Sequence, residues 1–542
     1  MTQAPSLARA SGSMAVATLV SRITGLAAKL LLAYVIGIGV VNDSYTVANT
    51  LPNIVYELLL GGVLTSIVVP VLVRAQREDA DGGLGYTQRL VTVAMVALGA
   101  ATVLAVLAAP LITRLYLDDS TGQANSTLAT AFAYLLLPEI IFYGLGALFA
   151  AILNTRGVFG APAWAPVLNN LVVIATLGVY TLVPGEISLN PVRMGDAKLL
   201  VLGIGTTLGI AAQAAVLLPA LRRVGFAFRW RFGWDARLTA FGGMALWVAG
   251  YVLVSQAGYV ATTRVASAAS AGSVATYSYA WLLLQVPYGV LGVSLLTAIM
   301  PRMSRAAAEG DTGRLVADLS LGERMSAVLL VPFSALLTVL GTATGVALFS
   351  LGNSSVEAAT RLGQTLAVSA FGLLPFAVVM LQLRAFYAMH DARTPTLINV
   401  IMVAVKVPLM LACPLVLAPD RVVLGLAAIN SVSFIAGAVV GELWLRARLG
   451  RLETGRVLVT VAQTVAAGLV VAAAVYLVDL AVARFAPDAV GAVGRAWITL
   501  LLGGLAGAVV AVVAMALLRV AELRPALAKV SARLPARLRQ QP

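Results

Sequence analysis

Long apolar runs separated by short polar connections dominate the chain. They occupy residues 14–41, 44–73, 89–117, 126–154, 162–183, 198–221, 238–263, 273–301, 319–349, 358–389, 395–418, 422–445, 457–483 and 495–518. Each run is long enough to supply the roughly 20 residues that a helix needs to cross the hydrocarbon core of a bilayer. The pattern therefore predicts an all-α polytopic membrane protein with fourteen transmembrane helices.

Three of these runs are long for a single crossing and contain prolines. They are 44–73, 273–301 and 358–389, with Pro52, Pro70, Pro287 and Pro375. Proline removes a backbone donor and clashes with the preceding turn of a helix. We therefore expect these three helices to tilt or to kink.

Two stretches of the chain recur later at nearly the same spacing. At an offset of 231 residues, the matching pairs are Gly61 and Gly292, Pro70 and Pro301, Arg74 and Arg305, Ala75 and Ala306, and Glu78 and Glu309. At an offset of 237, Leu136-Leu137-Pro138 matches Leu373-Leu374-Pro375. Six predicted helices make one repeat, and an even number of crossings keeps both copies in the same orientation. Parallel repeats of this kind are typical of transporters.

The repeat predicts how the chain is organised. An N-lobe of six helices (14–221) and a C-lobe of six helices (238–446) form a parallel pseudo-two-fold pair around a cavity, joined by a basic loop (222–237). The other predicted segments are a cytoplasmic N-terminus (1–13), two extra helices (447–518) and a basic tail (519–542).

Composition excludes several classes of protein. Only 11% of the 542 residues are charged and 60% are hydrophobic, whereas about 25% of a soluble domain is charged. A soluble enzyme, a disordered chain and a secreted disulfide scaffold are thereby excluded. One cysteine, Cys413, and one histidine, His390, exclude cysteine-based and multi-histidine metal sites. The four lysines all follow Ala or Val, so the chain has no GK[ST] phosphate-binding ending. We expect no cofactor, and transport driven by the membrane potential or by a Na⁺ or H⁺ gradient.

Basic residues predict the orientation in the membrane. With the N-terminus inside, cytoplasmic segments hold about three times as many Lys and Arg residues as the opposite loops, so both termini are expected in the cytoplasm. The patch Arg222, Arg223, Arg229 and Arg231 lies in one of these segments. Anionic membrane lipid explains it better than nucleic acid does.

Six ionisable residues of the apolar runs are expected inside the transmembrane helices, away from their ends: Arg22, Lys29, Glu57, Glu139, Arg384 and Lys406. Each would cost about 2.5–3.5 kcal/mol at the bilayer centre, so we expect it to face a cavity or a partner. Arg22 and Lys29 are two helical turns apart and share one face. Two cations on one face suit a pyrophosphate. The alternative is that Glu57 and Glu139 neutralise the pair structurally.

Two further cations have different expected roles. Lys406 lies in the middle of the run 395–418 between two valines, too deep for its ammonium to reach water easily. A fixed ammonium that does the work of a bound cation and a buried ion pair are the two interpretations. Arg384 lies near the cytoplasmic end of its run, where its side chain can extend to the interface.

Residues 21–72 read SRITGLAAKLLLAYVIGIGVVNDSYTVANTLPNIVYELLLGGVLTSIVVPVL. This segment resembles the opening of the MurJ (MviN) lipid II flippases of the MOP exporter superfamily, in the actinobacterial form. The SR..G start, the G.G...D turn, the A..LPN stretch and the closing VP all stand where that family has them. Residues 151–170 (AILNTRGVFGAPAWAPVLNN) and 287–304 (PYGVLGVSLLTAIMPRMS) extend the resemblance.

The resemblance implies a V-shaped, two-lobed transporter in the cell membrane. It would move the undecaprenyl-pyrophosphate-linked peptidoglycan precursor, lipid II, from the inner to the outer leaflet by alternating access. The groove near 447–518 would hold the lipid tail. Arg22 matches the first cavity arginine of the family and is expected to bind the pyrophosphate together with Lys29. Asp43 and Asn53 match the family's loop acid and LPN asparagine. The expected supporting residues of the cavity and gate are Asp43, Asn53, Glu57, Glu139 and Gln285.

The chain also departs from the family's pattern. Ala28, Tyr56-Glu57 and Leu282 stand where the family has further cavity arginines. Either Arg22 and Lys29 hold the pyrophosphate alone, or the cargo is another polyprenyl-linked glycan. Some relatives bind sodium in the second lobe, partly through the helix that contains Lys406 here. The Lys406 ammonium would then replace sodium and make turnover independent of it.

Three other functions remain as alternatives. One is a small-molecule or cation antiporter of the same superfamily, which a closed cavity with a proton-binding acid in the first lobe would favour. Another is a non-transporting scaffold that recruits cell-wall synthesis proteins. The third is a membrane glycosyltransferase, for which the adjacent acidic pair Asp118-Asp119 outside the membrane is the candidate. We interpret that pair as solvated loop residues.

Overall fold

The computed structural model describes residues 7–58, 68–233 and 242–523. Within these ranges the secondary structure is helical throughout, with short π- and 3₁₀-helical segments and no strand. Contacts divide the chain into two compact units. Unit 1 is Met1–Ala275 with Gly352–Ser354, and unit 2 is Thr276–Leu351 with Ser355–Pro542. The predicted all-α class is confirmed.

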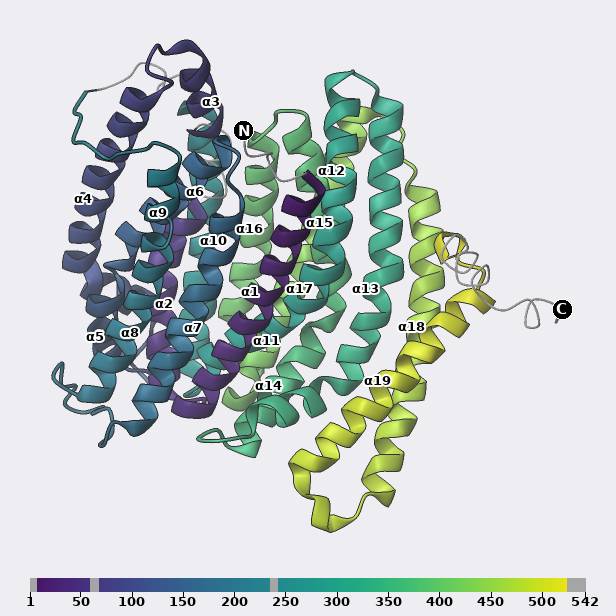
Figure 1. Cartoon of the computed structure of the whole chain (residues 1–542). Coiled ribbons are helices and arrows are strands. Elements are labelled where there is room, and N and C mark those ends of the chain that lie inside the picture. The colour runs from purple at the N-terminus through teal and green to yellow at the C-terminus, as the bar shows by residue number, and fades with distance from the viewer. Residues whose placement is uncertain (1–6, 59–67, 234–241, 524–542) are drawn as a thin grey trace. The chain divides into compact units, whose positions relative to one another are not determined.

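The helices follow the order of the predicted apolar runs (Figure 1). Unit 1 contains α1 (Leu7–Ile36), α2 (Val40–Leu58), α3 (Val69–Glu78), α4 (Leu84–Tyr116), α5 (Ser126–Leu136), α6 (Glu139–Thr155), α7 (Gly160–Leu182), α8 (Ala197–Ala215), α9 (Leu218–Arg223) and α10 (Gly242–Ala269). Next comes α11 (Ser273–Pro287), which begins at the end of unit 1. Unit 2 continues with η3 (Tyr288–Gly292), α12 (Val293–Ala308), α13 (Thr312–Phe349), α14 (Val356–Ser369), η4 (Ala370–Gly372), α15 (Leu373–Ala388), α16 (Arg393–Val416), η5 (Pro419–Arg421), α17 (Val422–Leu449), α18 (Thr454–Phe485), η6 (Asp488–Val490), α19 (Gly491–Leu517) and η7 (Ala521–Leu523).

Most of these helices can cross a membrane. Among the described residues, 11 helical segments are long and apolar enough for a span, or 12 if α5 and α6 form one bent span. The chain is therefore a multi-pass membrane protein by the length and composition of its helices. The predicted total of fourteen spans is not reached by this measure and stays a prediction.

Several helices break where prolines predict a break. The π-helical segment η3 follows Pro287 directly, and α14 gives way to η4 immediately before Leu373-Leu374-Pro375. In unit 1 the matching motif Leu136-Leu137-Pro138 separates α5 from α6 with a bend of 43°. Both copies of the repeated motif thus lie at a break in a helix, as a common origin of the two segments would predict. The predicted kink in 44–73 falls partly on 59–67, outside the described residues.

The division into units differs from the predicted lobes at one helix. Helix α10 packs against α2 and α4 and belongs to unit 1, so unit 1 ends at Ala275. The repeat places the same helix first in the C-lobe, after the loop 222–237. The lobe boundaries that the repeat predicts stay a prediction. Units 1 and 2 are defined by the contacts between residues, not by the repeat.

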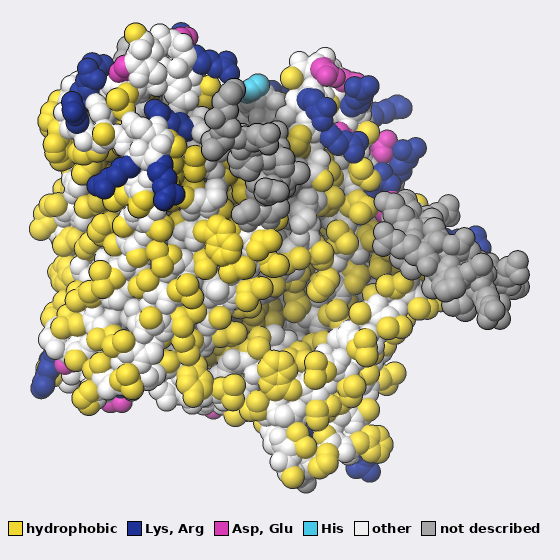
Figure 2. Space-filling view, in the orientation of Figure 1, with side chains coloured by type: hydrophobic (Ala, Val, Ile, Leu, Met, Phe, Trp, Pro, Cys, Tyr) yellow, Lys and Arg dark blue, Asp and Glu magenta, His cyan; other side chains and the backbone are white. Residues whose placement is uncertain are grey.

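The outer surface of the helices is suited to lipid. On α4, Leu104, Leu107 and Leu111 form a stripe with exposed fractions of 67%, 74% and 74%. Figure 2 shows hydrophobic side chains over the flank of unit 1 and Lys and Arg side chains at the end that carries α3 and α9. Exposed leucines in a row would cost free energy in water, but they match the hydrocarbon core of a bilayer.

The last two long helices form a hairpin on unit 2. Figure 1 shows α18 and α19 as neighbours, and both pack on α13 through a buried cluster that includes Leu340, Val471, Val475 and Ala511. These helices are the two that the repeat leaves over. The tail groove that the resemblance assigns to them stays a prediction.

Glycines bring α13 and α14 into backbone contact. A Cβ atom at Gly345 would lie 2.3 Å from the Ala359 carbonyl oxygen, and one at Gly363 would lie 2.5 Å from the Gly341 carbonyl oxygen. Small residues at such spacing let membrane helices approach closely, which gains van der Waals contact where no hydrophobic effect drives association. This pair is therefore intolerant of side chains at the contact.

We predict that Gly345→Ala destabilises the protein, because its methyl group would overlap a backbone oxygen that cannot move aside. Overpacking of this kind costs about 1–3 kcal/mol. Thermal unfolding of the purified protein in detergent measures the change. Gly504→Ala in α19 is the control, since no atom lies within 4 Å of its Cβ position. Equal unfolding temperatures for the two variants would contradict the packing account.

Candidate functional site

The α1 segment around Arg22 is fixed against α7. The Asn170 amide on α7 donates to the Ser21 carbonyl oxygen and to the Thr24 hydroxyl, both at 2.9 Å. A Cβ at Gly25 would lie 3.4 Å from the same amide, in ordinary van der Waals contact, so α1 and α7 approach closely at this point. The Arg22 side chain is exposed beside these contacts. Its backbone is therefore held in place while its guanidinium is free to meet an anion.

Lys29 lies two turns further along α1 and interacts electrostatically with Glu139. The ammonium is half-buried, and Glu139 at the start of α6 is 0% exposed. The two charges are not within the 4.0 Å of an ion pair. The structure thus brings together two of the residues that the sequence proposes, and it favours a neutralising role for Glu139 while leaving space between the charges.

Glu139 lies at the proline break between α5 and α6. The Thr207 hydroxyl on α8 donates to the Leu135 carbonyl oxygen at 2.7 Å and also lies 3.2 Å from Glu139 Oε1. The second oxygen, Oε2, is buried and has no hydrogen-bond partner among the described residues. A buried carboxylate oxygen without a partner is costly, so this position is suited to accept a proton or a transient cation.

The two other predicted cavity residues of α2 behave differently. The Asn53 amide donates to the Asn49 carbonyl oxygen at 2.8 Å, a local bond one turn back on its own helix. The Glu57 side chain is exposed near the end of α2. The structure does not join either of them to Arg22 or Lys29 by a hydrogen bond or an ion pair.

Asp43 anchors the junction that leads into unit 2. Its carboxylate is 1% exposed and accepts hydrogen bonds from the backbone N–H groups of Gly272 (2.7 Å) and Ala275 (2.8 Å). These groups lie at the start of α11, where a helix has unsatisfied donors and a positive dipole end that favours an anion. The bonds span about 230 residues of sequence and fasten the last residues of unit 1 to α2.

A second set of hydrogen bonds holds the connection between α13 and α14 against the end of α1. The C-terminal turn of α1 has carbonyl oxygens that need donors from outside the helix. The Asn353 backbone N–H donates to Tyr34 at 2.9 Å, its amide side chain donates to Val35 at 2.6 Å, and the Ser354 hydroxyl donates to Ala33 at 3.0 Å. Gly352 has a φ of +71° and leaves no room for a Cβ beside Tyr34. Three residues of the α13–α14 connection thus cap α1.

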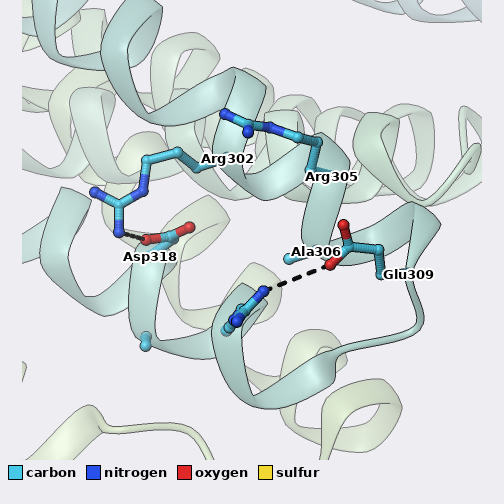
Figure 3. A pocket seen from close by; sticks show the side chains of 7 residues that line it. Arg302, Arg305, Ala306, Glu309 and Asp318 are labelled. Atoms are coloured by element: carbon cyan, nitrogen blue, oxygen red, sulfur yellow. Dashed lines mark ion pairs between the residues drawn. The ribbon is translucent and has the colours of Figure 1, made fainter.

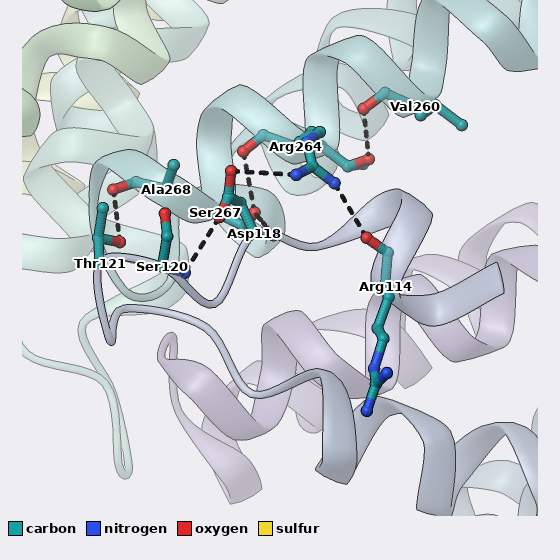
Figure 4. A network of polar contacts seen from close by, with 9 residues as sticks. Arg114, Asp118, Ser120, Thr121, Val260, Arg264, Ser267 and Ala268 are labelled. Carbon is teal, nitrogen blue, oxygen red and sulfur yellow. Dashed lines mark hydrogen bonds and ion pairs between the residues drawn. The ribbon is translucent and has the colours of Figure 1, made fainter. Parts of the chain in front are cut away.

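The loop between α4 and α5 holds the end of α10 (Figure 4). Arg264 pairs with Asp118 at 3.3 Å and donates to the Arg114 carbonyl oxygen at 3.0 Å, while the Asp118 backbone N–H donates to the Ser267 hydroxyl at 2.9 Å. Hydrogen bonds from Ser120, together with the Arg264 guanidinium, hold the pKa of Asp118 below its usual range. The interpretation of Asp118-Asp119 as solvated loop residues agrees with their position between α4 and α5, where Asp119 is exposed and the Asp118 side chain is 25% exposed. Asp118 has a structural role in addition, through its contacts with Arg264 and Ser267. Asp119 also has an internal role, since it accepts a hydrogen bond from the Ser126 backbone N–H at 3.0 Å.

In unit 2, Lys406 is half-buried on α16, and none of the carboxylates in the described ranges lies within ion-pair distance of it. The buried ion pair, one of the two interpretations of this lysine, therefore receives no support. Gln285 is half-buried on α11. Near it along the chain, Trp281 stacks on Phe434 at 5.7 Å and meets Phe376 edge-on at 5.3 Å.

Two neighbouring acids in unit 2, Glu323 and Glu442, are not identified from the sequence. Glu323 on α13 is 6% exposed, accepts a 3.4 Å hydrogen bond from the Gln382 amide and lies near Glu442 on α17. The prediction of six ionisable residues inside helices is incomplete, because Glu323 lies near the start of the predicted run 319–349 and well inside α13, which already begins at Thr312. In the part of the chain that the structure describes, no three His, Cys, Asp or Glu side chains could hold a metal ion.

A polar pocket of about 480 Å³ lies between α12 and α13 (Figure 3). Arg302 pairs with the buried Asp318, and Arg314 pairs with Glu309 at 3.5 Å. In the repeat, Arg305 and Glu309 match Arg74 and Glu78, which pair with each other on α3 at 2.9 Å. In the second copy, the acid Glu309 pairs with Arg314 on the next helix, α13, and so joins two elements, whereas Glu78 pairs within its own helix.

Comparison with known proteins identifies the family. Residues 32–490 match the family described as lipid II flippase MurJ. The chain belongs to the MurJ family. This is a family of transporters, not of enzymes.

Relatives and solved structures agree with this assignment. A probable lipid II flippase MurJ of Rhizobium meliloti is 28% identical over 486 residues, which cover 87% of this chain and 86% of the relative. The lipid II flippase MurJ of Burkholderia cenocepacia is 28% identical, with 71% and 73% covered. The solved structure "Lipid II flippase MurJ, inward closed conformation" has a TM-score of 0.74 at 19% identity and covers 95% of this chain and 99% of its own. An inward-facing multidrug MATE transporter of the MOP superfamily gives 0.59 at 16% identity, with 78% and 98% covered. Both show the fold alone.

We predict that Asp43→Ala loosens the start of α11, because two buried N–H groups lose their acceptor. An unsatisfied buried donor costs about 1–3 kcal/mol. Hydrogen exchange of the peptide that contains Gly272 and Ala275 should become faster, and Asp43→Asn, which keeps one acceptor oxygen, should be intermediate. Unchanged exchange in Asp43→Ala would show that these bonds do not anchor the junction.

Proposed function

We propose that this protein is a flippase that moves lipid II, an undecaprenyl-pyrophosphate-linked peptidoglycan precursor, from the inner to the outer leaflet of the cell membrane. The observation that carries the proposal is the match to the MurJ family over residues 32–490. A fold that covers 95% of this chain and 99% of a solved MurJ supports it further. Peptidoglycan synthesis is the process that such a transporter serves.

Arg22 and Lys29 are the proposed contacts of the pyrophosphate. They lie on one continuous helix, α1, and a rise of 1.5 Å per residue places their Cα atoms about 10 Å apart along its axis. The exposed guanidinium can grip one phosphate through two N–H groups, and the ammonium can meet the other as a point charge. Glu139 balances Lys29 when the site is empty, so an arriving anion competes with a carboxylate already close by.

The anchors at Asp43 and Asn353 are the proposed gate. Both fasten segments that continue into unit 2, at Ala275 and at Ser354. Alternating access requires such bonds to break and to form again in each cycle, and hydrogen bonds to backbone groups are weak enough individually for this. Asp43 therefore has a role in the cycle as well as in stability.

We also propose that both termini lie in the cytoplasm. The exposed arginines at the α3 and α9 end of unit 1 include Arg74, Arg77, Arg222 and Arg229, as the excess of positive charge inside predicts. A cysteine at position 229 in a Cys413→Ala background should react with a membrane-impermeant maleimide only after the cells are opened. Labelling in intact cells would reverse the orientation.

Depletion of the protein in its own host tests the flippase function. Wild type should restore delivery of precursor to the outer leaflet, and Arg22→Ala and Lys29→Ala should restore it poorly, each by tenfold or more if about 1.5–3 kcal/mol of a charged hydrogen bond is lost. Glu139→Gln should retain transport, because it removes only the competitor. Lys198→Ala, on a loop-flanking turn of α8, is the control. Normal delivery in depleted cells would refute the function.

A second candidate function is a proton-coupled antiporter, favoured by the buried Glu139 in unit 1 and by the MATE fold match. It predicts the opposite result for one variant. Glu139→Gln would then abolish transport, because the carboxylate would be the proton carrier. The same variant panel therefore separates the two functions.

Lys406 is proposed to take the place of a bound sodium ion in unit 2. Its half-buried side chain has no carboxylate of the described ranges within ion-pair distance, so an ammonium there would place a positive charge where a cation could otherwise bind. Purified protein in vesicles should transport equally well in sodium and in potassium buffers, and Lys406→Met should reduce transport in both. Activity of the wild type that stops without sodium would contradict this role.

A further inference from the structure

Unit 1 contains an apolar cavity away from Arg22 and Lys29. It has a volume of about 620 Å³ and lies among α4, α6, α8 and α9, within the range of about 300–1,000 Å³ that ligand pockets occupy. Its wall includes Val91, Met95, Phe149 and Ala215, and Arg222 is the one charged residue of the lining. The cavity is therefore suited to a long apolar group with an anionic end.

The wall on one side is a segment that we name the strap, residues 224–232, between α9 and α10. Three side chains from other helices fasten its backbone. Gln88 donates to the Ala227 carbonyl oxygen at 2.7 Å, Arg156 donates to Val224 at 2.8 Å, and the Arg231 N–H donates to the Thr92 hydroxyl at 3.1 Å. The strap is thus a fixed part of unit 1, and the cavity is a built feature.

Aromatic side chains line up along the strap. Phe228 meets Trp230 edge-on at 5.2 Å, and Trp230 stacks on Phe232 at 6.0 Å with an interplanar angle of 7°. These rings are 39%, 58% and 74% exposed. The exposed Trp230 is of the type enriched at the membrane–water interface, where its apolar ring and its polar N–H are both accommodated, and the two phenylalanines extend its apolar surface. The strap is therefore expected at the level of the lipid headgroups.

The charges on the strap and on the adjoining end of α9 are of two kinds. Arg231 on the strap is close to Asp81, and the backbone N–H groups of Gly85 and Gly83, together with the Arg231 guanidinium, hold the pKa of Asp81 below its usual range. Arg222 is exposed at the cavity and makes no ion pair with any carboxylate of the described ranges. A free guanidinium next to an apolar cavity is complementary to a phosphate that carries an acyl chain.

We propose that this cavity binds an acyl chain of an anionic phospholipid of the inner leaflet, with the lipid phosphate against Arg222 and the aromatic strap among the headgroups. The occupant is a resident membrane lipid, and the site is separate from the α1 residues that are proposed to bind cargo. The proposal goes beyond transport and rests on the cytoplasmic placement of the α9 end.

Photolabelling of the full-length protein in vesicles tests the site. The probe is phosphatidylglycerol with a diazirine on one acyl chain, and labelled peptides are mapped by mass spectrometry. Label is expected on the peptides that contain Val91, Met95 and Phe149. Arg222→Gln should reduce this label about fivefold, the effect of one cation near anionic lipid. Arg223→Gln, the neighbouring exposed arginine outside the lining, should stay close to wild type.

A second pair of variants tests the apolar part. Ala215→Phe places a ring in the cavity from an exposed position and should remove the label, whereas Val216→Phe, exposed at 42% and outside the lining, should not. Unchanged unfolding temperatures exclude a folding defect. Equal labelling by Arg222→Gln and Arg223→Gln, or by phosphatidylglycerol and phosphatidylcholine probes, would overturn the proposal. Displacement of the label by a polyprenyl phosphate would also overturn it, by assigning the cavity to the cargo tail. Transport activity enters none of these measurements.

Discussion

A bilayer offers no water to backbone N–H and C=O groups, so each interrupted or ended helix inside it must find partners elsewhere in the protein. This constraint explains the long-range polar contacts of unit 1. Thr207 serves the Leu135 carbonyl at a proline break, Asn353 and Ser354 cap α1, and Asp43 takes the free N–H groups before and at the start of α11. Because each partner comes from a distant segment, satisfying the backbone also ties those segments together.

The apolar interior of the bilayer also limits where charged side chains can lie. A cation in an apolar environment needs an opposite charge, a route to water or a ligand. Arg384 is exposed, and Lys29 has Glu139 within electrostatic range. Arg22 is exposed beside a well-held segment of α1, and Lys406 lacks a carboxylate at ion-pair distance in the described part of the chain. Arg22 and Lys406 thus lack a structural partner that would explain their charge. For this reason Arg22 is the proposed cargo contact and Lys406 has the proposed coupling role. Arg222 is likewise exposed without an ion pair among the described residues, and its proposed partner is a lipid.

The hydrophobic pattern predicts this fold well because each membrane helix can be recognised from its own apolar run, without knowledge of the rest of the chain. The runs, the break after Pro287 and the shared Leu-Leu-Pro break could all be predicted, and residues 21–72 were enough to indicate the family. Contacts between distant segments could not be predicted, since periodicity describes one helix at a time. Asp43 accepts hydrogen bonds from groups about 230 residues away, and Asp118 pairs with Arg264 on α10. Glu323 is left out of the sequence prediction because this residue lies near the start of the run 319–349, where a charge is expected at the membrane interface, whereas α13 already begins at Thr312. The electrostatic interaction of Lys29 with Glu139 agrees with the neutralising role, which is one of the alternatives, although the two charges are farther apart than an ion pair.

The central claim is that α1 carries the cargo's pyrophosphate through Arg22 and Lys29. The most direct measurement is translocation of fluorescent lipid II by the purified protein in sealed vesicles, followed by quenching of the probe in the outer leaflet. The account predicts that wild-type protein exposes the lipid to the quencher, that Arg22→Ala and Lys29→Ala do so far more slowly, and that a lipid with the same tail but no pyrophosphate is not moved. Equal rates for the wild type and both variants, or for both lipids, would contradict it.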